Sequence, residues 1–366
     1  MRHWMKISLG LLVLALVSFG LMSGCSTPAV RTDTQRPAHH TDDGFQNPHL
    51  PPFDKNVFSY WRMRLFDGYE WADQSAEVDQ LPIVTLDPEP LRGPQSKLQI
   101  SWLGHASFLV QYHDVNVLTD PIFSRRASPV NFAGPVRHVP AALQVDELPR
   151  IDYVVISHNH YEHLDIRSIQ ALGNEPMYLV PLGLKSWFER AGISSDRVRE
   201  LDWWEFEAFE HNAQSVTITA TPSQHWSART LFDRNHSLWA AWHIDLDGHS
   251  VWFAGDTGYN THQFRAVPAR LNRVSVALLP IGAYEPRSFM KEQHVNPEEA
   301  VLMHQDLRAC QSIAMHWGTF PLSAEGLLQP VHALREAKEL HQVSSDEFQV
   351  FAIGERRQYA DDFCQS

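Results

Sequence analysis

From residue 97 onward, short apolar runs alternate with polar positions and turn residues, a pattern typical of β-strands. Leu98, Ile100 and Trp102 are separated by single polar residues, so they are expected on one face of a strand. Further runs of strand length follow at 107–112, 115–118, 151–156, 216–220, 237–244, 251–254, 274–279, 313–315 and 348–353.

Longer stretches with helical character lie between several of these runs. They span 182–191, about 260–271, 297–309 and about 324–340, the last interrupted or entered at Pro330. Asn296 followed by Pro297 is favourable start chemistry for the third helix. Because strands and helices interleave in both halves, the sequence predicts an α/β fold in which two mixed sheets face each other with helices outside.

The first 24 residues have the composition of a signal peptide. Arg2 and Lys6 precede the apolar stretch 7–22, which is too short for a comfortable membrane span and ends at Ser23-Gly24-Cys25. Small residues directly before a cysteine resemble the lipobox of bacterial lipoproteins, which implies that Cys25 is acylated. The alternative is an ordinary secreted protein cut near Gly24.

Ser26, rather than Asp, after the cysteine resembles the outer-membrane sorting class, so we expect a lipid-anchored protein of the outer membrane that faces the periplasm. No second apolar stretch of spanning length follows. We expect a signal peptide over 1–24, a flexible tether over 25–52, an N-terminal arm over 53–96 and the main folded domain over 97–360. The aromatic stretch 58–66 of the arm is interpreted as core cover rather than as an element that dips into a membrane.

The net charge and the cysteine content exclude some classes of protein. The formal charge is −13, and removal of residues 1–24 with their two basic side chains gives −13 − 2 = −15. A chain this acidic does not offer the Lys/Arg footprint that nucleic acid requires. Besides Cys25 the chain has only Cys310 and Cys364, which can pair in an oxidising compartment but form no disulfide framework.

Residues that can bind a metal follow four of the predicted strands. The run 151–156 leads into His158, His160, Glu162 and His163, and later runs lead into one ligand-capable residue each: His225, Asp256 and His316. Open α/β sheets place their sites at such strand ends, and imidazole and carboxylate are ligands of Zn²⁺. Because the chain has 21 histidines, His225 or His316 alone would be weak evidence for a metal site. The presence of all seven residues in this order after successive strands predicts two metal ions bridged by Asp256.

This order of residues resembles the HxHxDH…H…D…H pattern of the metallo-β-lactamase superfamily. Within it the chain is similar to N-acylphosphatidylethanolamine-hydrolysing phospholipase D, and also to bacterial outer-membrane proteins of the RomA type. The matching motifs lie within about residues 60–355, at 102–107, 118–124, 201–204, 224–227, 253–259, 281–287, 293–300 and 314–320.

The resemblance implies an αββα sandwich and a role for each site residue. His158, His160 and His225 would hold one zinc; Glu162, His163 and His316 would hold the second; and Asp256 would lie between them. Tyr161 and His294 would touch the phospholipid substrate. Glu162 stands where the family has Asp, and its extra methylene puts the geometry of the second zinc in question.

Two zinc ions that share a hydroxide can hydrolyse a phosphodiester, with Asp256 as the bridging catalytic ligand. Arg287 is a candidate phosphate contact or a surface arginine. Asp120 and His105 are candidates to orient the zinc histidines from behind, although Asp before Pro is also common in turns. The sequence therefore predicts a zinc phosphodiesterase of phospholipase D type that acts on membrane phospholipid.

Two other functions are compatible with the same residues. One is a zinc lactonase or amidase acting on a small molecule, and the other is a non-catalytic lipoprotein stabilised by zinc. The oligomeric state is not predicted.

Overall fold

The computed structural model describes residues 36–51, 55, 57–212, 214–271 and 273–364. The chain divides into two compact units, Met1–Pro37 and Ala38–Ser366, and the second contains all elements considered below. The predicted signal peptide, Cys25 and the first part of the tether lie outside the described residues. Within the described part, no helix is both long and apolar enough to cross a membrane.

The first sheet has seven strands in the order β14-β1-β2-β3-β4-β5-β6. Its first half is antiparallel, and from β3 to β6 the strands run parallel. The strands are β1 (Gln95–Gly104), β2 (Ser107–His113), β3 (Val115–Thr119), β4 (Tyr153–Val155), β5 (Met177–Pro181), β6 (Val198–Leu201) and β14 (Arg356–Gln358).

The second sheet repeats this plan in the order β13-β12-β11-β10-β9-β8-β7. From β7 to β10 the strands are antiparallel, and from β10 to β13 they are parallel. The strands are β7 (Phe206–His211), β8 (Gln214–Thr221), β9 (Ala241–Leu246), β10 (His249–Phe253), β11 (Val276–Pro280), β12 (Gln311–Met315) and β13 (Phe348–Gln349).

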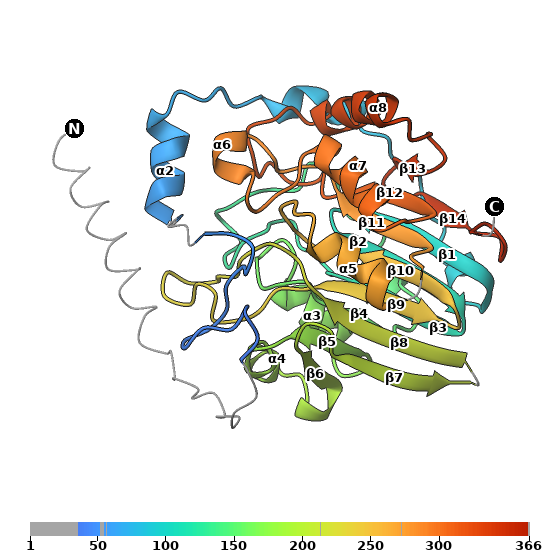
Figure 1. The fold of residues 1–366 in the computed structure, drawn as a ribbon. Helices are drawn as coiled ribbons and strands as arrows, with labels where there is room; N and C mark the ends of the chain where they lie inside the picture. Colours follow the sequence, from blue (N-terminus) through green and yellow to red (C-terminus); the bar gives the residue numbers. More distant parts are fainter. Residues whose placement is uncertain (1–35, 52–54, 56, 213, 272, 365–366) are drawn as a thin grey trace. The chain divides into compact units, whose positions relative to one another are not determined.

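Helices cover the outer faces of the two sheets (Figure 1). Helix α4 packs on β6 of the first sheet, whereas α7 packs on β11 of the second and also contacts α5 and α8. The α-helices are α2 (Val57–Phe66), α3 (Ile166–Leu172), α4 (Lys185–Arg190), α5 (Gln263–Arg270), α6 (Arg287–Met290), α7 (Pro297–Asp306) and α8 (Gln329–His341). Short 3₁₀ helices are η2 (Gln74–Gln80), η3 (Glu89–Leu91), η4 (Val145–Glu147) and η5 (Ser195–Arg197).

Alternation along the strands explains the layered core. On β2, Phe108 joins the cluster between the sheets while its neighbour Leu109 joins the cluster under α3 and α4. Trp242 and Trp252 of the second sheet lie in the same inner cluster as Phe108, and all three are fully buried. Successive strand side chains point to opposite faces, so each strand contributes to both layers. The predicted fold of two mixed sheets with helices outside is confirmed.

Local sequence signals mark several helix boundaries as predicted. The side chain of Asn296 accepts a hydrogen bond from the backbone N–H of Glu299, and Pro297 occupies the first turn of α7. Pro330 lies in the first turn of α8, so this helix is entered at Pro330 and not interrupted there. Near the carboxyl end, Cys310 and Cys364 form a disulfide with a Cα–Cα distance of 5.4 Å.

The interpretation of the aromatic stretch 58–66 as core cover is wrong for three of its side chains. The stretch forms helix α2, in which Met63 is buried but Trp61, Leu65 and Phe66 are exposed. Its outward apolar side chains are taken up below.

Residues 38–50, which fall within the predicted tether, contact the domain. His39 and His40 each place Nε2 within hydrogen-bond distance of the Asp202 carboxylate, at 2.7 and 2.8 Å. Further along, the side-chain amide of Asn47 donates to the carbonyl of His225 over 2.8 Å. Residues 38–50, called the strap below, therefore run from the turn before β7 to the loop that carries His225.

Candidate metal centre

Loops at the carboxyl ends of four strands bring the predicted ligands together. His158, His160 and His163 follow β4, His225 follows β8, Asp256 follows β10 and His316 follows β12 directly. All six of these side chains are buried. The two sheets thus contribute to one cluster, which is the convergence that the sequence pattern predicts.

The first set of donors is His158, His160 and His225. Nδ1 of His160 lies 2.9 Å from Nε2 of His158 and 3.4 Å from Nε2 of His225. Nitrogens bound to one tetrahedral zinc are separated by about 3.3 Å, from Zn–N distances of about 2.0–2.1 Å. The spacing therefore fits a single cation between the three rings.

Hydrogen bonds on the far side of two rings set their tautomers. Nδ1 of His225 lies 2.9 Å from the carbonyl oxygen of Gln293, which only accepts, so Nδ1 carries the proton. Nδ1 of His158 donates to Ser157 Oγ over 2.9 Å, and that hydroxyl donates to Asp120 over 2.5 Å. Both Nε2 atoms then present lone pairs to the cluster, as metal ligands must.

The second set is His163 and His316, whose Nε2 atoms lie 3.2 Å apart. Nδ1 of His163 donates to Asp120 Oδ2 over 2.6 Å, so this ring turns its Nε2 atom inward. The ring of His105 stacks 4.1 Å from that of His316, and its Nε2 is buried without a hydrogen-bond partner. His105, His163 and His316 form one group whose ligand atoms lie within 4.8 Å of one another.

Asp256 joins the two sets. One oxygen lies 3.0 Å from His316 Nε2, and the other lies 3.2 Å from His163 Nε2 and 3.8 Å from His225 Nε2. Neither oxygen has a hydrogen bond in the described residues, although both are buried. A buried carboxylate without donors is costly unless a cation compensates it, so this position fits a metal bridge.

Glycine before Asp256 is required by the close approach of the two strand ends. Gly255 has φ +57°, and a Cβ there would lie 2.4 Å from Cβ of Ser157. Any larger residue would push Asp256 away from the His158 loop. The Gly-Asp turn noted in the sequence is thus part of the site's geometry.

Burial and charge shift the titration of this cluster in opposite directions. Burial lowers the pKa of His158 and His160 well below the usual value, and that of His225 to about 3. For His163, burial is outweighed by the charges of Asp256 and Asp120, which raise its pKa well above 6.5. Burial alone would raise the pKa of Asp256, but His163 and His316 hold it well below its usual value. His158, His160 and His225 are therefore neutral at pH 7 and able to bind a metal, whereas His163 has to release a proton before it can do so.

His294 lies at the open side of the cluster, where the sequence places a substrate contact. Its Nδ1 is 3.9 Å from Asp256 Oδ2, and it forms a further potential metal-binding group with His225 and Asp256. Its side chain is 12% exposed, more than those of His158, His163 and His225. Tyr161, the other predicted substrate contact, is partly exposed and donates its hydroxyl to the carbonyl of Arg229 over 2.7 Å.

Arg287 and Glu162 lie differently from their predicted roles. The guanidinium of Arg287 donates to the carbonyl of His294 over 2.8 Å and to Glu299 Oε2 over 2.7 Å, so it fixes the His294 backbone. Glu162 is partly exposed, and its charge acts on Arg229. The described residues show no hydrogen bond or ion pair between Glu162 and Asp256, His163 or His316, and its role as a ligand stays a prediction.

Asp120 and His105, the two residues predicted to orient the metal ligands, lie against the cluster. Asp120 contacts both His163 and Ser157, and His105 lies beside His316. Sequence analysis missed Ser157, whose hydroxyl links His158 to Asp120, and the carbonyl of Gln293 that orients His225. Ser157 could have been considered from its place directly before His158. The carbonyl of Gln293 belongs to the backbone, so the residue type at this position does not indicate its role.

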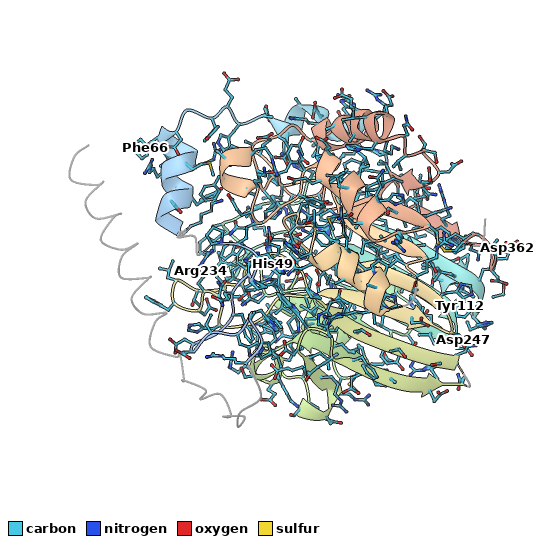
Figure 2. The ribbon with its side chains drawn as sticks, viewed as in Figure 1. His49, Phe66, Tyr112, Arg234, Asp247 and Asp362 are labelled. Carbon is cyan, nitrogen blue, oxygen red and sulfur yellow. A yellow bond between two sulfur atoms is a disulfide. The ribbon has the colours of Figure 1, made fainter. Side chains whose placement is uncertain are left out.

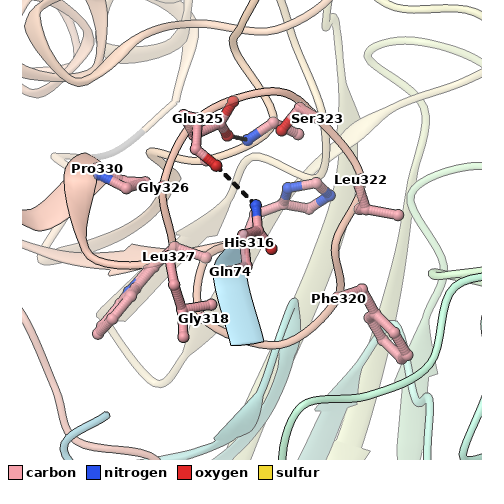
Figure 3. Close-up of a pocket in the computed structure, with 13 residues that line it drawn as sticks. Gln74, His316, Gly318, Phe320, Leu322, Ser323, Glu325, Gly326, Leu327 and Pro330 are labelled. Atoms are coloured by element: carbon pink, nitrogen blue, oxygen red, sulfur yellow. Dashed lines mark hydrogen bonds between the residues drawn. The ribbon is translucent and has the colours of Figure 1, made fainter. Parts of the chain in front are cut away.

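A small cavity adjoins His316 on the side of α8 (Figure 3). Its volume is about 20 Å³, enough for one water molecule. Glu325 on its wall accepts hydrogen bonds from the backbone N–H groups of Ala283 and Glu285 at 2.6 and 3.0 Å. A cavity of this size does not hold a phospholipid headgroup, whereas His294 and Tyr161, on another side of the cluster, are partly exposed.

Replacing Asp120 by asparagine is expected to lower metal content and turnover by about 10–100-fold, the usual effect of losing a partner that orients a metal ligand. The amide can still accept from His163, but it no longer supplies the charge that helps raise the pKa of this ring. Metal analysis after dialysis measures the effect. Replacement of exposed Asp114 by asparagine is the control, and equal metal content in both variants would contradict the role of Asp120.

Comparison with known proteins agrees with this geometry. A family model described as a beta-lactamase superfamily domain matches residues 115–317. An N-acyl-phosphatidylethanolamine-hydrolyzing phospholipase D of Caenorhabditis elegans is 38% identical over 282 residues, 75% of this chain and 79% of that protein. The mitochondrial enzyme of the same name from Saccharomyces cerevisiae is 36% identical over 72% of this chain and 56% of its own length.

Solved structures show the same fold at lower identity. The isothiocyanate hydrolase from Delia radicum gut bacteria aligns with a TM-score of 0.56 and 19% identity, covering 72% of this chain and 99% of that one. A possible metal-dependent hydrolase from Veillonella parvula aligns with a TM-score of 0.56 and 18% identity over 72% of this chain and 100% of its own. At this identity the likeness concerns the fold alone. The sequence relatives and the family model go further: this chain belongs to the metallo-β-lactamase superfamily, as a metal-dependent hydrolase similar to N-acylphosphatidylethanolamine-hydrolysing phospholipase D.

Proposed function

We propose that the protein is a zinc-dependent phosphodiesterase of phospholipase D type. It hydrolyses N-acylphosphatidylethanolamine, or a related phospholipid, to phosphatidic acid and the corresponding ethanolamide or amine. The observation that carries the proposal is the position of Asp256 between two sets of imidazole nitrogens, in a chain 38% identical to a phospholipase D of this type. We further propose that the protein is tethered by acyl chains on Cys25 to the outer membrane, facing the periplasm.

The residues present fit two zinc ions. His158, His160 and His225 would hold one, His163 and His316 would hold the other together with Glu162, and Asp256 would contact both. When bound, the pair of ions would activate water and neutralise the charge that develops on the attacked phosphate. An acidic protein repels a phosphodiester anion, so the local positive charge at this cluster has to dominate the approach.

The protein's own residues then position the lipid and handle the proton. His294, with a pKa lowered well below its usual value mainly by burial, is neutral and can accept or donate a hydrogen bond at the open side of the cluster. Arg287 fixes the backbone of His294 and thereby its distance from Asp256. Tyr161 presents one face of its ring to the guanidinium of Arg229, 4.1 Å away, which keeps it beside His160.

Lipid mass spectrometry after incubation with defined N-acylphosphatidylethanolamine tests the proposal. The zinc-loaded protein is expected to release phosphatidic acid and the ethanolamide, and the His225→Ala variant is expected to release neither. Hydrolysis of lactones or amides with no lipid turnover would replace the proposal by the small-molecule alternative. Bound zinc without any turnover would favour the non-catalytic lipoprotein.

Replacing Glu162 by aspartate is expected to increase occupancy of the second metal position by restoring the shorter carboxylate of the family pattern. The side chain is partly exposed, so little packing is lost. Titration calorimetry with zinc measures the second binding event, and Glu175→Asp at an exposed carboxylate is the control. Identical second affinities in both variants would remove Glu162 from the ligand set.

A further inference from the structure

The most exposed large apolar side chains of the described residues are Phe66, Phe132 and Phe232. Their exposed fractions are 80%, 80% and 79%. Two of the three have other exposed apolar side chains nearby: Trp61 and Leu65 accompany Phe66, and Leu231 accompanies Phe232. Single exposed apolar residues are ordinary on soluble proteins, but clusters at defined positions mark interaction sites.

Helix α2, which carries Phe66, is held against the segment that positions His294. The ring of Tyr60 contacts that of Phe289 in α6, with centroids 6.3 Å apart, and Tyr69 hydrogen-bonds to Ser288 over 2.5 Å. The carbonyl of Met290, at the end of α6, accepts from the backbone N–H of His294 over 2.9 Å. The outward face of α2 therefore lies close to the open side of the metal cluster.

The loop of residues 228–236, which carries Phe232, is fixed to the metal-binding loop. The guanidinium of Arg229 donates to the carbonyls of Asn159 and Leu164, both over 2.8 Å. Arg234 lies 4.3 Å above the ring of Trp226, which itself packs 4.3 Å from His160. Figure 2 shows Phe66 and Arg234 toward the same side of the view, opposite Tyr112 and Asp247.

The third side chain, Phe132, lies in a loop that reaches the cluster from the other direction. Ala127 of this loop packs with Phe320, and the ring of Phe320 contacts that of His105 with centroids 5.2 Å apart. All three of the most exposed aromatic side chains are thus connected, through one or two contacts, to candidate metal-binding residues or their neighbours.

The position of the strap and the charges on α2 indicate which partner fits the surface formed by these aromatic side chains. The backbone N–H of Phe45 donates to the carbonyl of Asn235 over 2.9 Å, so the strap runs along the Phe232 loop. If Cys25 is acylated as proposed, the 13 residues from it to Ala38 can reach at most about 45 Å, at about 3.5 Å per residue. Helix α2 carries two arginines and no acidic residue, in a chain of net charge −13. A phospholipid surface matches the apolar tips and can also contact Arg62, which is exposed although it pairs with Asp67 over 3.6 Å.

We propose that Phe66, Phe132 and Phe232, with Trp61, Leu65 and Leu231, form a membrane-docking surface next to the loops that hold the candidate metal ligands. The three aromatic tips insert into the headgroup region of a bilayer, and partly exposed His294 then lies near the lipid. This surface acts in addition to any acyl anchor, which limits distance to the membrane but sets no orientation. The inference does not depend on the reaction that the metal site catalyses.

Site-specific fluorescence of the full chain on vesicles tests the docking surface. Phe66→Cys, Phe132→Cys and Phe232→Cys are each labelled with an environment-sensitive dye and bound to vesicles of phosphatidylethanolamine and phosphatidylglycerol that contain nitroxide-labelled lipid. The matched control is Leu340→Cys on α8, which replaces an apolar side chain that is 69% exposed. The labelled parent protein corrects for any dye on the native cysteines.

The labels at 66, 132 and 232 are expected to be quenched several-fold more strongly than the label at 340. Quenching equal to that of the control at all three positions would overturn the proposal. Shielding that grows with protein concentration before lipid is added would also overturn it, because a second copy of the chain would then cover the surface. Strong quenching without any lipid turnover would leave the docking surface in place and contradict the proposed function alone.

Discussion

Asp256→Asn is expected to reduce turnover by on the order of 10³-fold or more, beyond the 10–100-fold typical of a residue that acts through a ligand. Asparagine preserves the shape of Asp256 but removes the negative charge shared by the two sets of imidazoles. Without that charge the pKa of His163 falls, and two cations would lie close together with no anionic ligand from the protein between them. Steady-state kinetics and metal analysis of the purified variant measure the loss.

The design of this test separates chemistry from folding. Asp256 lies on a buried loop, so the variant is accepted only if its circular dichroism spectrum and thermal midpoint remain close to those of the parent. Asp245→Asn, on neighbouring strand β9 and partly exposed, is the matched control for removal of one carboxylate. A folded Asp256→Asn protein with two metals and activity within ten-fold of the parent would remove Asp256 from its bridging position.

Much of this site could be predicted because its ligands are recognisable residue types at the ends of apolar runs. His158, His160, His163, His225, Asp256 and His316 meet as the spacing predicts. Most of the strands were visible from the same signal, since alternation on strands such as β2 divides two buried layers. Strands β5, β6, β7 and β14 were missed. In β7 charged residues separate the apolar ones, and no side chain is fully buried, so the strand forms no continuous apolar run.

Other features depend on tertiary contacts that residue types do not encode. The exposure of Phe66 was missed because an aromatic stretch at the start of a domain is more often buried than presented to solvent. Arg287 was considered as a phosphate contact or a surface arginine because it is a cation in the loop after Ile281, and the fold shows it donating to Glu299 and to the carbonyl of His294. The role of Asp120 was left open between a turn and a partner for histidine, and the fold gives it both: φ is +31° and it contacts His163.

Acidification is expected to destabilise the metal-free protein strongly between about pH 6.5 and pH 3. Burial lowers the pKa of His225 from 6.5 to about 3, so the unfolded chain takes up a proton in this window and the folded chain does not. The contribution of His225 to the free energy of unfolding is fully present above pH 6.5 and is lost as the pH falls below this value. At pH 5 the loss from His225 alone is about 2 kcal/mol, rising to about 4 kcal/mol near pH 3. His158 and His160 act in the same direction, whereas the raised pKa of His163 changes stability only above pH 6.5.

Thermal midpoints of the chelator-treated and zinc-loaded proteins, measured from pH 7.5 to pH 4.5, test this dependence. Zinc competes with protons for the same lone pairs of the imidazoles. The thermal midpoint of the zinc-loaded protein should therefore stay constant to a lower pH than that of the metal-free protein, and it should fall at the pH where zinc is released. His225→Asn should flatten the acid slope of the metal-free protein, while His332→Asn at an exposed position should leave it unchanged. A metal-free midpoint that is constant from pH 7.5 to pH 5 would mean that the folded and unfolded chains take up protons equally, so that burial does not lower the pKa of these imidazoles.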